Sequence, residues 1–340
     1  MLRLYKPVEH NIFKLQTMLE HLVCSVWCEA NAEDTCESKL NADFKIIYDS
    51  YEWLKQEVDD IYSKFIPLSD EDKQIIKDAF ITDNKIENLC EGTEIPIYLN
   101  TLPEIVENDI KPLLVDFYEK LLERAQVPGT KKDYYQKLID ANDFQYCPCC
   151  GLIDFESSDS KYREAFDHYL PKSDYPFASV NFHNLVPLCY KCNSDRKKAK
   201  DPIKNGRKAF YPFIIEGQPE HRIGIKITLD KSKDLRNLDK ADLTIEFEGD
   251  TEKIETWDSL FDIKERYNDT TRNKISKTLL QRIKRRHQLF KKNDEGWTYD
   301  NTLDFLINDY ENDLYEDKKF LKRPFMIELK SSTSLIEVYG

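Results

Sequence analysis

The segment NLVPLCYKCN, residues 184–193, ends in a Cys-x-x-Cys turn, and FQYCPCCG, residues 144–151, contains another. Four cysteines therefore lie in two pairs with 38 residues between them, Cys147 with Cys150 and Cys189 with Cys192. Four thiolates at this spacing are typical of a closed, tetrahedral structural zinc site. Short apolar runs that end in such turns favour strands and tight knuckles over helices. The sequence thus predicts a small region held together by Zn²⁺.

Cys149 lies inside the first pair and complicates the choice of ligands. The two-residue gap and the Gly151 that follows favour Cys147 and Cys150. The alternative is that some of these cysteines are buried thiols that bind no metal. In a reducing compartment, such pairs bind metal more readily than they form disulfides.

Between the two turns lies FDHYLPKSDYP, residues 166–176, in which Asp167 directly precedes His168. Phosphodiester hydrolysis needs a base that activates water and a cation that neutralises developing charge. A neutral imidazole near pH 7 suits the first task, and Asp167 with Asn193 would offer Mg²⁺ hard oxygen ligands. Adjacent strand residues point to opposite faces, so Asp167 and His168 can serve one site only if the strand ends or twists there.

The order Cys-x-x-Cys, Asp-His, Asn-Leu, Cys-x-x-Cys-Asn resembles the HNH endonuclease family, whose ββα-metal fold packs two strands and a helix around one catalytic cation. The resemblance covers residues 144–208. It implies that His168 is the general base, Asp167 a metal ligand, Asn184 the residue that holds the metal loop in shape, and Asn193 the last motif position. Many members have histidine at that position, so the chain looks like the HNN variant, in which an oxygen ligand favours Mg²⁺ or Mn²⁺.

The segment DHYLPKSDYP followed by NLVPLCYKCN is most similar to the motif of the HNH nucleases of bacterial anti-phage systems. These include the HNH subunit of Septu-type systems, which works with an ATPase. The resemblance does not explain the first 140 residues. His183, beside Asn184, is a weaker candidate, for which a structural place in a turn is favoured.

The rest of the chain predicts an α+β protein of three regions. Apolar residues at helical spacing over 8–30 and 42–65, with the capping pattern SDED from Ser69, predict an acidic helical domain. RIGIKITLD and DLTIEFEG alternate with period two and predict paired strands, after which helical spacing returns. The predicted regions are a helical N-terminal domain (1–140), a zinc-stapled ββα-metal HNH nuclease domain (141–210) and a mixed α+β C-terminal region (211–340).

The net charge of −13 argues against a protein whose whole surface is basic and binds nucleic acid, but basic residues cluster in two places. Residues 191–208 contain eight Lys or Arg and two acids, and residues 274–292 contain eight and no acid. A charge run is usually a solvated face, yet two patches beside a nuclease motif favour phosphate-backbone contacts and weak sequence preference. The predicted contacts are Lys172, Arg196, Lys197, Lys198, Lys200, Arg282, Arg285 and Arg286.

These patterns predict a metal-dependent DNA endonuclease that acts in anti-phage defence. An RNA-directed nuclease or toxin is an alternative, because the attacked phosphate is similar in both polymers. A non-catalytic zinc module that binds nucleic acid or a protein is another, although the presence of Asp167, His168 and Asn193 together argues against it.

Neither a membrane span of roughly 20 apolar residues nor a signal peptide is evident, so a cytoplasmic protein without a membrane partner is expected.

Residues 29–62 and 300–317 are rich in acids that would repel DNA and favour a protein partner, and the resemblance implies an ATPase. Simple solubility is the alternative. On the partner hypothesis, the chain without residues 1–140 keeps its cleavage activity and loses the partner.

Overall fold

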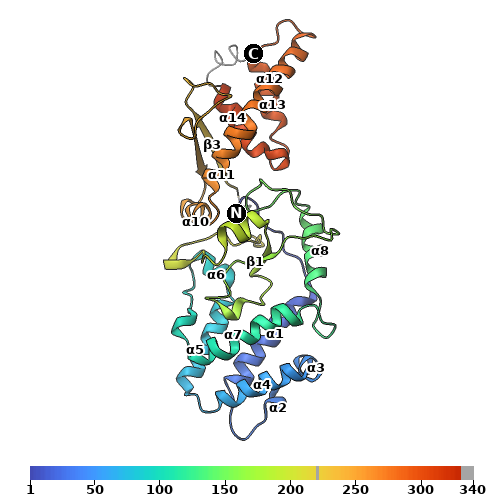
Figure 1. The fold of residues 1–340 in the computed structure, drawn as a ribbon, viewed down its shortest axis with the longest axis vertical. Coiled ribbons are helices and arrows are strands. Elements are labelled where there is room, and N and C mark those ends of the chain that lie inside the picture. Colours follow the sequence, from blue (N-terminus) through green and yellow to red (C-terminus); the bar gives the residue numbers. More distant parts are fainter. Residues whose placement is uncertain (220–221, 331–340) are drawn as a thin grey trace. The chain divides into compact units, whose positions relative to one another are not determined.

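The computed structural model describes residues 1–219 and 222–330, which pack into two compact units (Figure 1). One unit combines residues 4–144 and 155–219, and the other combines residues 1–3, 145–154 and the described part of 220–340. Each unit is mainly helical and contains one two-stranded sheet. The predicted α+β class is therefore confirmed, whereas the region boundaries at 140 and 210 stay a prediction.

Eight α-helices precede the cysteine-rich segment. They are α1 (Lys14–His21), α2 (Cys36–Lys39), α3 (Ala42–Ser50), α4 (Glu52–Phe65), α5 (Asp70–Asp83), α6 (Ile86–Glu91), α7 (Lys111–Asp116) and α8 (Lys131–Asn142). A π-helical stretch, Leu22–Trp27, continues α1, and two more, Val106–Ile110 and Phe117–Leu121, flank α7. The predicted cap of the third helix is confirmed, because the Ser69 side chain accepts a hydrogen bond from the Asp72 N–H.

The helix expected over residues 42–65 is two helices, because the chain breaks at Tyr51. Tyr51 is extended (φ −137°, ψ 105°), so α3 ends before it and α4 begins after it. The buried residues of α3 include Phe44 and Ile47, and those of α4 include Leu54. Both helices therefore bury the apolar face that periodicity predicts, and the same periodicity hides the break.

Aromatic residues of the helices pack directly on the segment that carries the Asp-His pair. Tyr134 of α8 stacks on Phe166, with ring centroids 5.9 Å apart, and Phe80 of α5 contacts Phe177 edge-on at 5.4 Å. Tyr98 lies 5.5 Å from Tyr175. Because these buried contacts join residues 4–144 to residues 155–219, the helices and the Asp-His segment share one core.

The second unit contains the predicted strand pair. β3 (Gly224–Leu229) pairs antiparallel with β4 (Leu243–Glu248), with Gly224 opposite Glu248 and Leu229 opposite Leu243. Five helices follow: α10 (Thr251–Phe261), α11 (Ile263–Thr270), α12 (Ser276–Lys291), α13 (Tyr299–Asp309) and α14 (Lys319–Lys330). Figure 1 shows β3 beside these helices.

The acidic stretch near residue 300 is part of this core as well as of the surface. Leu303, Leu306 and Ile307 of α13 are buried, while acids such as Asp304 face solvent. Among the described residues, no helix combines the length and the apolar character that crossing a bilayer requires.

Asp83, the last residue of α5, predicts how stability depends on pH. Its side chain is fully buried, and Oδ1 accepts a hydrogen bond from the Ile97 N–H at 3.3 Å. Burial raises the pKa of Asp83 to about 8, and the hydrogen bond from Ile97 opposes the rise. The folded chain then keeps a proton that the unfolded chain loses near pH 4, at the usual pKa of about 3.9. This contribution to stability is complete below about pH 4 and is lost as pH rises towards 8.

We expect the free energy of unfolding to fall with rising pH by up to about 1.4 kcal/mol per pH unit between pH 5 and 8. Asp83→Asn removes the titrating group, so its unfolding free energy should fall less over that range. Urea unfolding at a series of pH values measures both, and Asp78→Asn, an exposed acid of the same helix, is the control. Parallel profiles for Asp83→Asn and the unmodified chain would contradict the prediction.

Candidate functional site

Two short strands followed by a helical turn carry the candidate catalytic residues. The elements are β1 (Phe166–His168), β2 (Leu185–Pro187), α9 (Tyr190–Cys192) and a π-helical turn (Asn193–Lys197). The strands are antiparallel, with Asp167 opposite Val186 and His168 opposite Leu185. β1 ends at His168, as the sequence requires if Asp167 and His168 are to serve one site.

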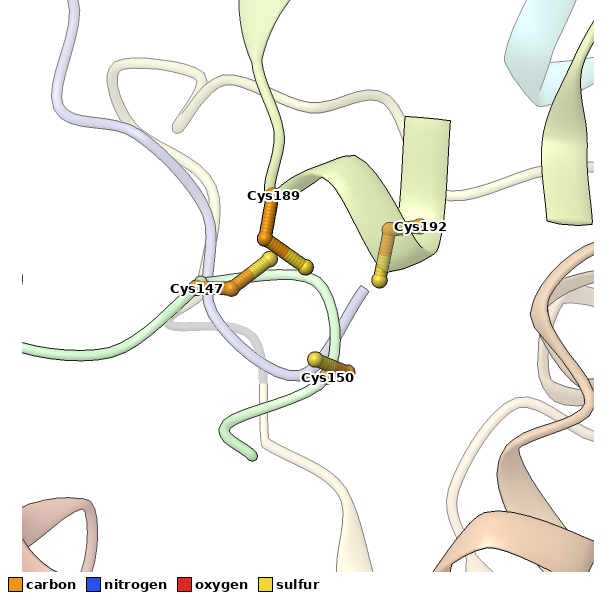
Figure 2. A group of neighbouring side chains, drawn as sticks. All are labelled: Cys147, Cys150, Cys189 and Cys192. Carbon is orange, nitrogen blue, oxygen red and sulfur yellow. The ribbon is translucent and has the colours of Figure 1, made fainter. Parts of the chain in front are cut away.

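Four buried thiols come together where the sequence predicts a zinc site. Their sulfur atoms all lie within 4.8 Å of one another and belong to Cys147, Cys150, Cys189 and Cys192. Figure 2 shows the four sulfur atoms turned towards a common centre, with Cys189 just before the short helix α9 and Cys192 at its end. A tetrahedral Zn²⁺ with Zn–S bonds of about 2.3 Å holds its sulfurs roughly 3.8 Å apart, so this donor set fits a structural zinc ion.

The two Cys-x-x-Cys turns are closed in the same way by their backbones. The Gly151 N–H donates to the Cys147 carbonyl at 2.7 Å, and the Asn193 N–H donates to the Cys189 carbonyl at 3.0 Å. Gly151 has φ +64°, and a Cβ there would lie 2.6 Å from the Leu2 side chain, so glycine is needed. Cys149 is buried but lies outside the cluster, whose sulfur atoms belong to Cys147, Cys150, Cys189 and Cys192.

The fully buried carboxamide of Asn184 holds the loop between β1 and β2. Its Oδ1 accepts from the Leu170 N–H at 2.7 Å, and its Nδ2 donates to the carbonyls of Leu170 at 2.9 Å and Ala178 at 3.1 Å. The Asn184 carbonyl also accepts from the Tyr169 N–H. Asn184 thus shapes the loop that follows His168.

The His168 ring is fixed by two neighbours. Nε2 lies 3.0 Å from the Ser179 carbonyl oxygen, and the ring meets the Tyr118 ring at a centroid distance of 4.7 Å. A carbonyl oxygen only accepts hydrogen bonds, so Nε2 carries the proton and the lone pair of the neutral ring lies on Nδ1. Burial and the Lys172 ammonium lower the pKa of His168 to about 4, which keeps the imidazole neutral at pH 7.

Asp167 and Lys197 form a buried ion pair. The Lys197 ammonium lies 3.2 Å from Oδ1 and 3.1 Å from Oδ2 of Asp167, with exposed side-chain fractions of 0% and 3%. Burial raises the pKa of Asp167, and the Lys197 charge opposes that rise. Lys197 is therefore not a surface contact for phosphate, in contrast to the sequence prediction.

The oxygens of Asp167 and Asn193 are not brought together by any contact that we observe among the described residues. The Asn193 amide points to the Ala165 carbonyl, with Nδ2 and O 3.5 Å apart, while the Asp167 carboxylate pairs with Lys197. A hydrated divalent cation needs open space around its ligands, which a 3% exposed, ion-paired carboxylate does not offer. The predicted Mg²⁺ or Mn²⁺ donor set does not fit this arrangement.

The other predicted nucleic-acid contacts lie at or near the surface of their own units. Lys172 pairs with Glu119 at 3.3 Å, and Arg196 donates to the Lys191 carbonyl. Exposed positions are Lys198 and Lys200 after the π-helical turn and, on α12, Arg282, Arg285 and Arg286. Whether these residues contact nucleic acid stays a prediction.

Sequence reasoning missed Tyr118 and Ser179, which hold the His168 ring. Tyr118 lies 50 positions upstream of His168, in a helical segment whose spacing predicts only a packed face. Ser179 acts through its backbone carbonyl, which carries no residue-type signal. Lys197 was missed as an ion-pair partner because it stands within a run of basic residues.

Two known proteins are similar to part of the chain. The chain is 31% identical over 110 residues to protein ea31 of Escherichia phage lambda, covering 32% of this chain and 34% of that protein. It is 31% identical over 140 residues to the Septu protein PtuB of Bacillus thuringiensis, covering 37% of this chain and 49% of that protein. The matches thus span about a third and about half of these relatives. No family model and no solved structure matches the chain.

The four-thiol cluster predicts which cysteine substitutions lower the zinc content. We expect Cys189→Ser or Cys192→Ser to lower zinc content and reduce thermal stability, because structural zinc supplies about 10–16 kcal/mol of binding free energy in small zinc domains. Metal analysis of the purified proteins measures the zinc, and Cys149→Ser, a buried cysteine outside the cluster, should retain it. Undiminished zinc in Cys189→Ser would count against the four-thiolate site.

Proposed function

We propose that the chain is an endonuclease that hydrolyses phosphodiester bonds of DNA and acts in bacterial anti-phage defence. Three findings support the proposal: the strand, strand and helix order around Asp167 and His168, the four-thiol cluster, and the similarity to a Septu protein. Because the match to PtuB covers only part of either chain, activity, substrate and partner are all parts of this proposal.

The state of His168 carries the proposal. A neutral imidazole with its proton on Nε2 presents the lone pair of Nδ1, which can take a proton from an attacking water. The water oxygen forms the new bond to phosphorus while one of its protons moves to Nδ1. The bond from phosphorus to the sugar oxygen breaks, and the departing oxygen keeps the electron pair and takes a proton from solvent. The negative charge of a bound phosphodiester raises the pKa of the imidazole, which makes it a stronger base in the complex than in the free chain.

A catalytic Mg²⁺ or Mn²⁺ enters the proposal through the resemblance alone. The Asp167 carboxylate is held by Lys197, so the residues present do not fit that cation, and no step is assigned to one. This pairing is the one observation that favours the rival function, a zinc module without catalysis. The motif does not separate DNA from RNA, and exposed Lys198 and Lys200 suit the phosphates of either polymer.

A protein partner is the second part of the proposal. Exposed acids on α3 and α4, including Asp43, Glu52 and Asp60, suit a basic protein surface, and the resemblance implies an ATPase. Removal of residues 1–140 would take away the acidic surface together with Tyr118, which touches His168, and Tyr134, which stacks on Phe166. The remaining chain would lose contacts that hold the candidate site, so it is not expected to keep cutting, and point variants are the suitable test.

His168→Ala should abolish cleavage, by at least about 100-fold, because general bases contribute roughly 10²–10⁴-fold to rates. The variant should keep its zinc and its affinity for DNA. Plasmid nicking, metal analysis and DNA-binding anisotropy measure the three properties. His183→Gln, which changes the histidine beside Asn184 that stacks on Phe13, should cut at the unmodified rate. Full activity of His168→Ala would refute the assignment of the base.

Triple charge reversal at Asp43, Glu52 and Asp60 to Lys should weaken co-purification with the partner ATPase, because complementary charges would become repulsive. A matched variant with three exposed acids reversed elsewhere, at Glu104, Glu255 and Glu295, should co-purify normally. Equal loss in both variants, or in neither, would argue that the acids on α3 and α4 serve solubility alone.

A further inference from the structure

The Lys197 side chain joins the helical turn to both residues of the Asp-His pair. Its ammonium reaches both Asp167 oxygens, at 3.2 and 3.1 Å, and donates to the His168 carbonyl at 2.8 Å. It also lies 5.9 Å from the centre of the Tyr169 ring. One buried cation thus holds the end of β1 from the side opposite to β2.

Burial of this lysine calls for a reason beyond phosphate binding. Taking a charged ammonium out of water is costly unless a counter-ion and hydrogen-bond acceptors replace the solvent, and here two groups of β1 do so. Lys198, the next residue, has φ +52° and ψ −127°, a rare conformation for a residue with a side chain. Such strain persists where the surrounding contacts fix the backbone, as at functional sites.

We propose that Lys197 is a positioning residue for His168. The His168 carbonyl is held by Lys197, and the following N–H, that of Tyr169, is held by the Asn184 carbonyl. These two contacts fix the backbone on which the imidazole is carried, and the ring then meets Ser179 and Tyr118. The inference rests on the proposed function, because it takes His168 to be the base.

Three roles of Lys197 make different predictions for kinetics. A positioning residue affects the rate of the bound complex, because a misplacement of about 1 Å can cost about 100-fold in rate. Loss of a phosphate contact lowers the affinity for DNA and reduces the slope of its salt dependence by about 1. Substitution of a residue that only stabilises the fold lowers the folded fraction of the protein. The molecules that remain folded then cut at the unmodified rate.

The test uses the full-length chain with Lys197→Met, Lys197→Gln and Lys198→Met. We expect Lys197→Met to lower kcat on saturating plasmid DNA by about 100-fold, normalised to folded protein, with unchanged affinity. Lys197→Gln keeps a donor for the His168 carbonyl and should recover part of the rate. Lys198→Met, at an exposed lysine predicted to contact phosphate, should weaken DNA binding. A fourth variant, Lys85→Met, changes an exposed lysine outside the predicted contacts and should leave kcat and DNA affinity unchanged.

A Lys197→Met protein with normal kcat and weakened DNA binding would overturn the inference, as would one whose activity falls only with its folded fraction. If the unmodified chain does not cut, the proposed function fails, and NMR of the His168 ring then tests the positioning by itself. In folded Lys197→Gln, the His168 ring signals should shift, whereas in Lys198→Met they should not. Unshifted signals in Lys197→Gln would overturn the inference even if Lys197→Met fails to fold.

Discussion

The buried carboxamide of Asn184 is the interaction on which the candidate site depends. It satisfies both backbone groups of Leu170 and the carbonyl of Ala178, and so sets the path of the loop between β1 and β2. The next residue in that loop, Ser179, supplies the carbonyl that fixes the His168 ring. Each net hydrogen bond contributes only about 1 kcal/mol, but a buried group left without a partner costs about 1–3 kcal/mol. Asn184 therefore specifies a single loop conformation and, through it, the tautomer of His168.

The electrostatics of the site follow from burial rather than from the net charge of the chain. Asp167 and Lys197 neutralise each other in a place that water does not reach, and His168 stays neutral because its charged form would be desolvated beside Lys172. A site of this kind holds little charge until an anion arrives. A phosphodiester would then meet a neutral base, with exposed lysines nearby in the chain at 198 and 200.

Local patterns in the sequence predicted the parts of the structure that local physics determines. The four thiol ligands follow from two Cys-x-x-Cys turns, the cap at Ser69 from side-chain chemistry, and β3 with β4 from alternation. Periodicity could not show the break at Tyr51, since apolar spacing continues across it. Nor could it show that Tyr118 covers His168 or that Lys197 is buried among exposed basic residues, because both depend on contacts between distant segments.

The most direct measurement is whether the zinc-loaded, full-length chain cuts nucleic acid at all. Supercoiled plasmid DNA and RNA would each be incubated with the protein in Mg²⁺, in Mn²⁺ or in EDTA. The proposed function predicts nicked or linear plasmid, and the resemblance to the HNH endonucleases implies that this cutting needs a divalent cation and stops in EDTA. Intact DNA under every condition, with a protein shown to be folded and zinc-loaded, would contradict it. Cleavage of RNA alone would move the proposal to the other polymer.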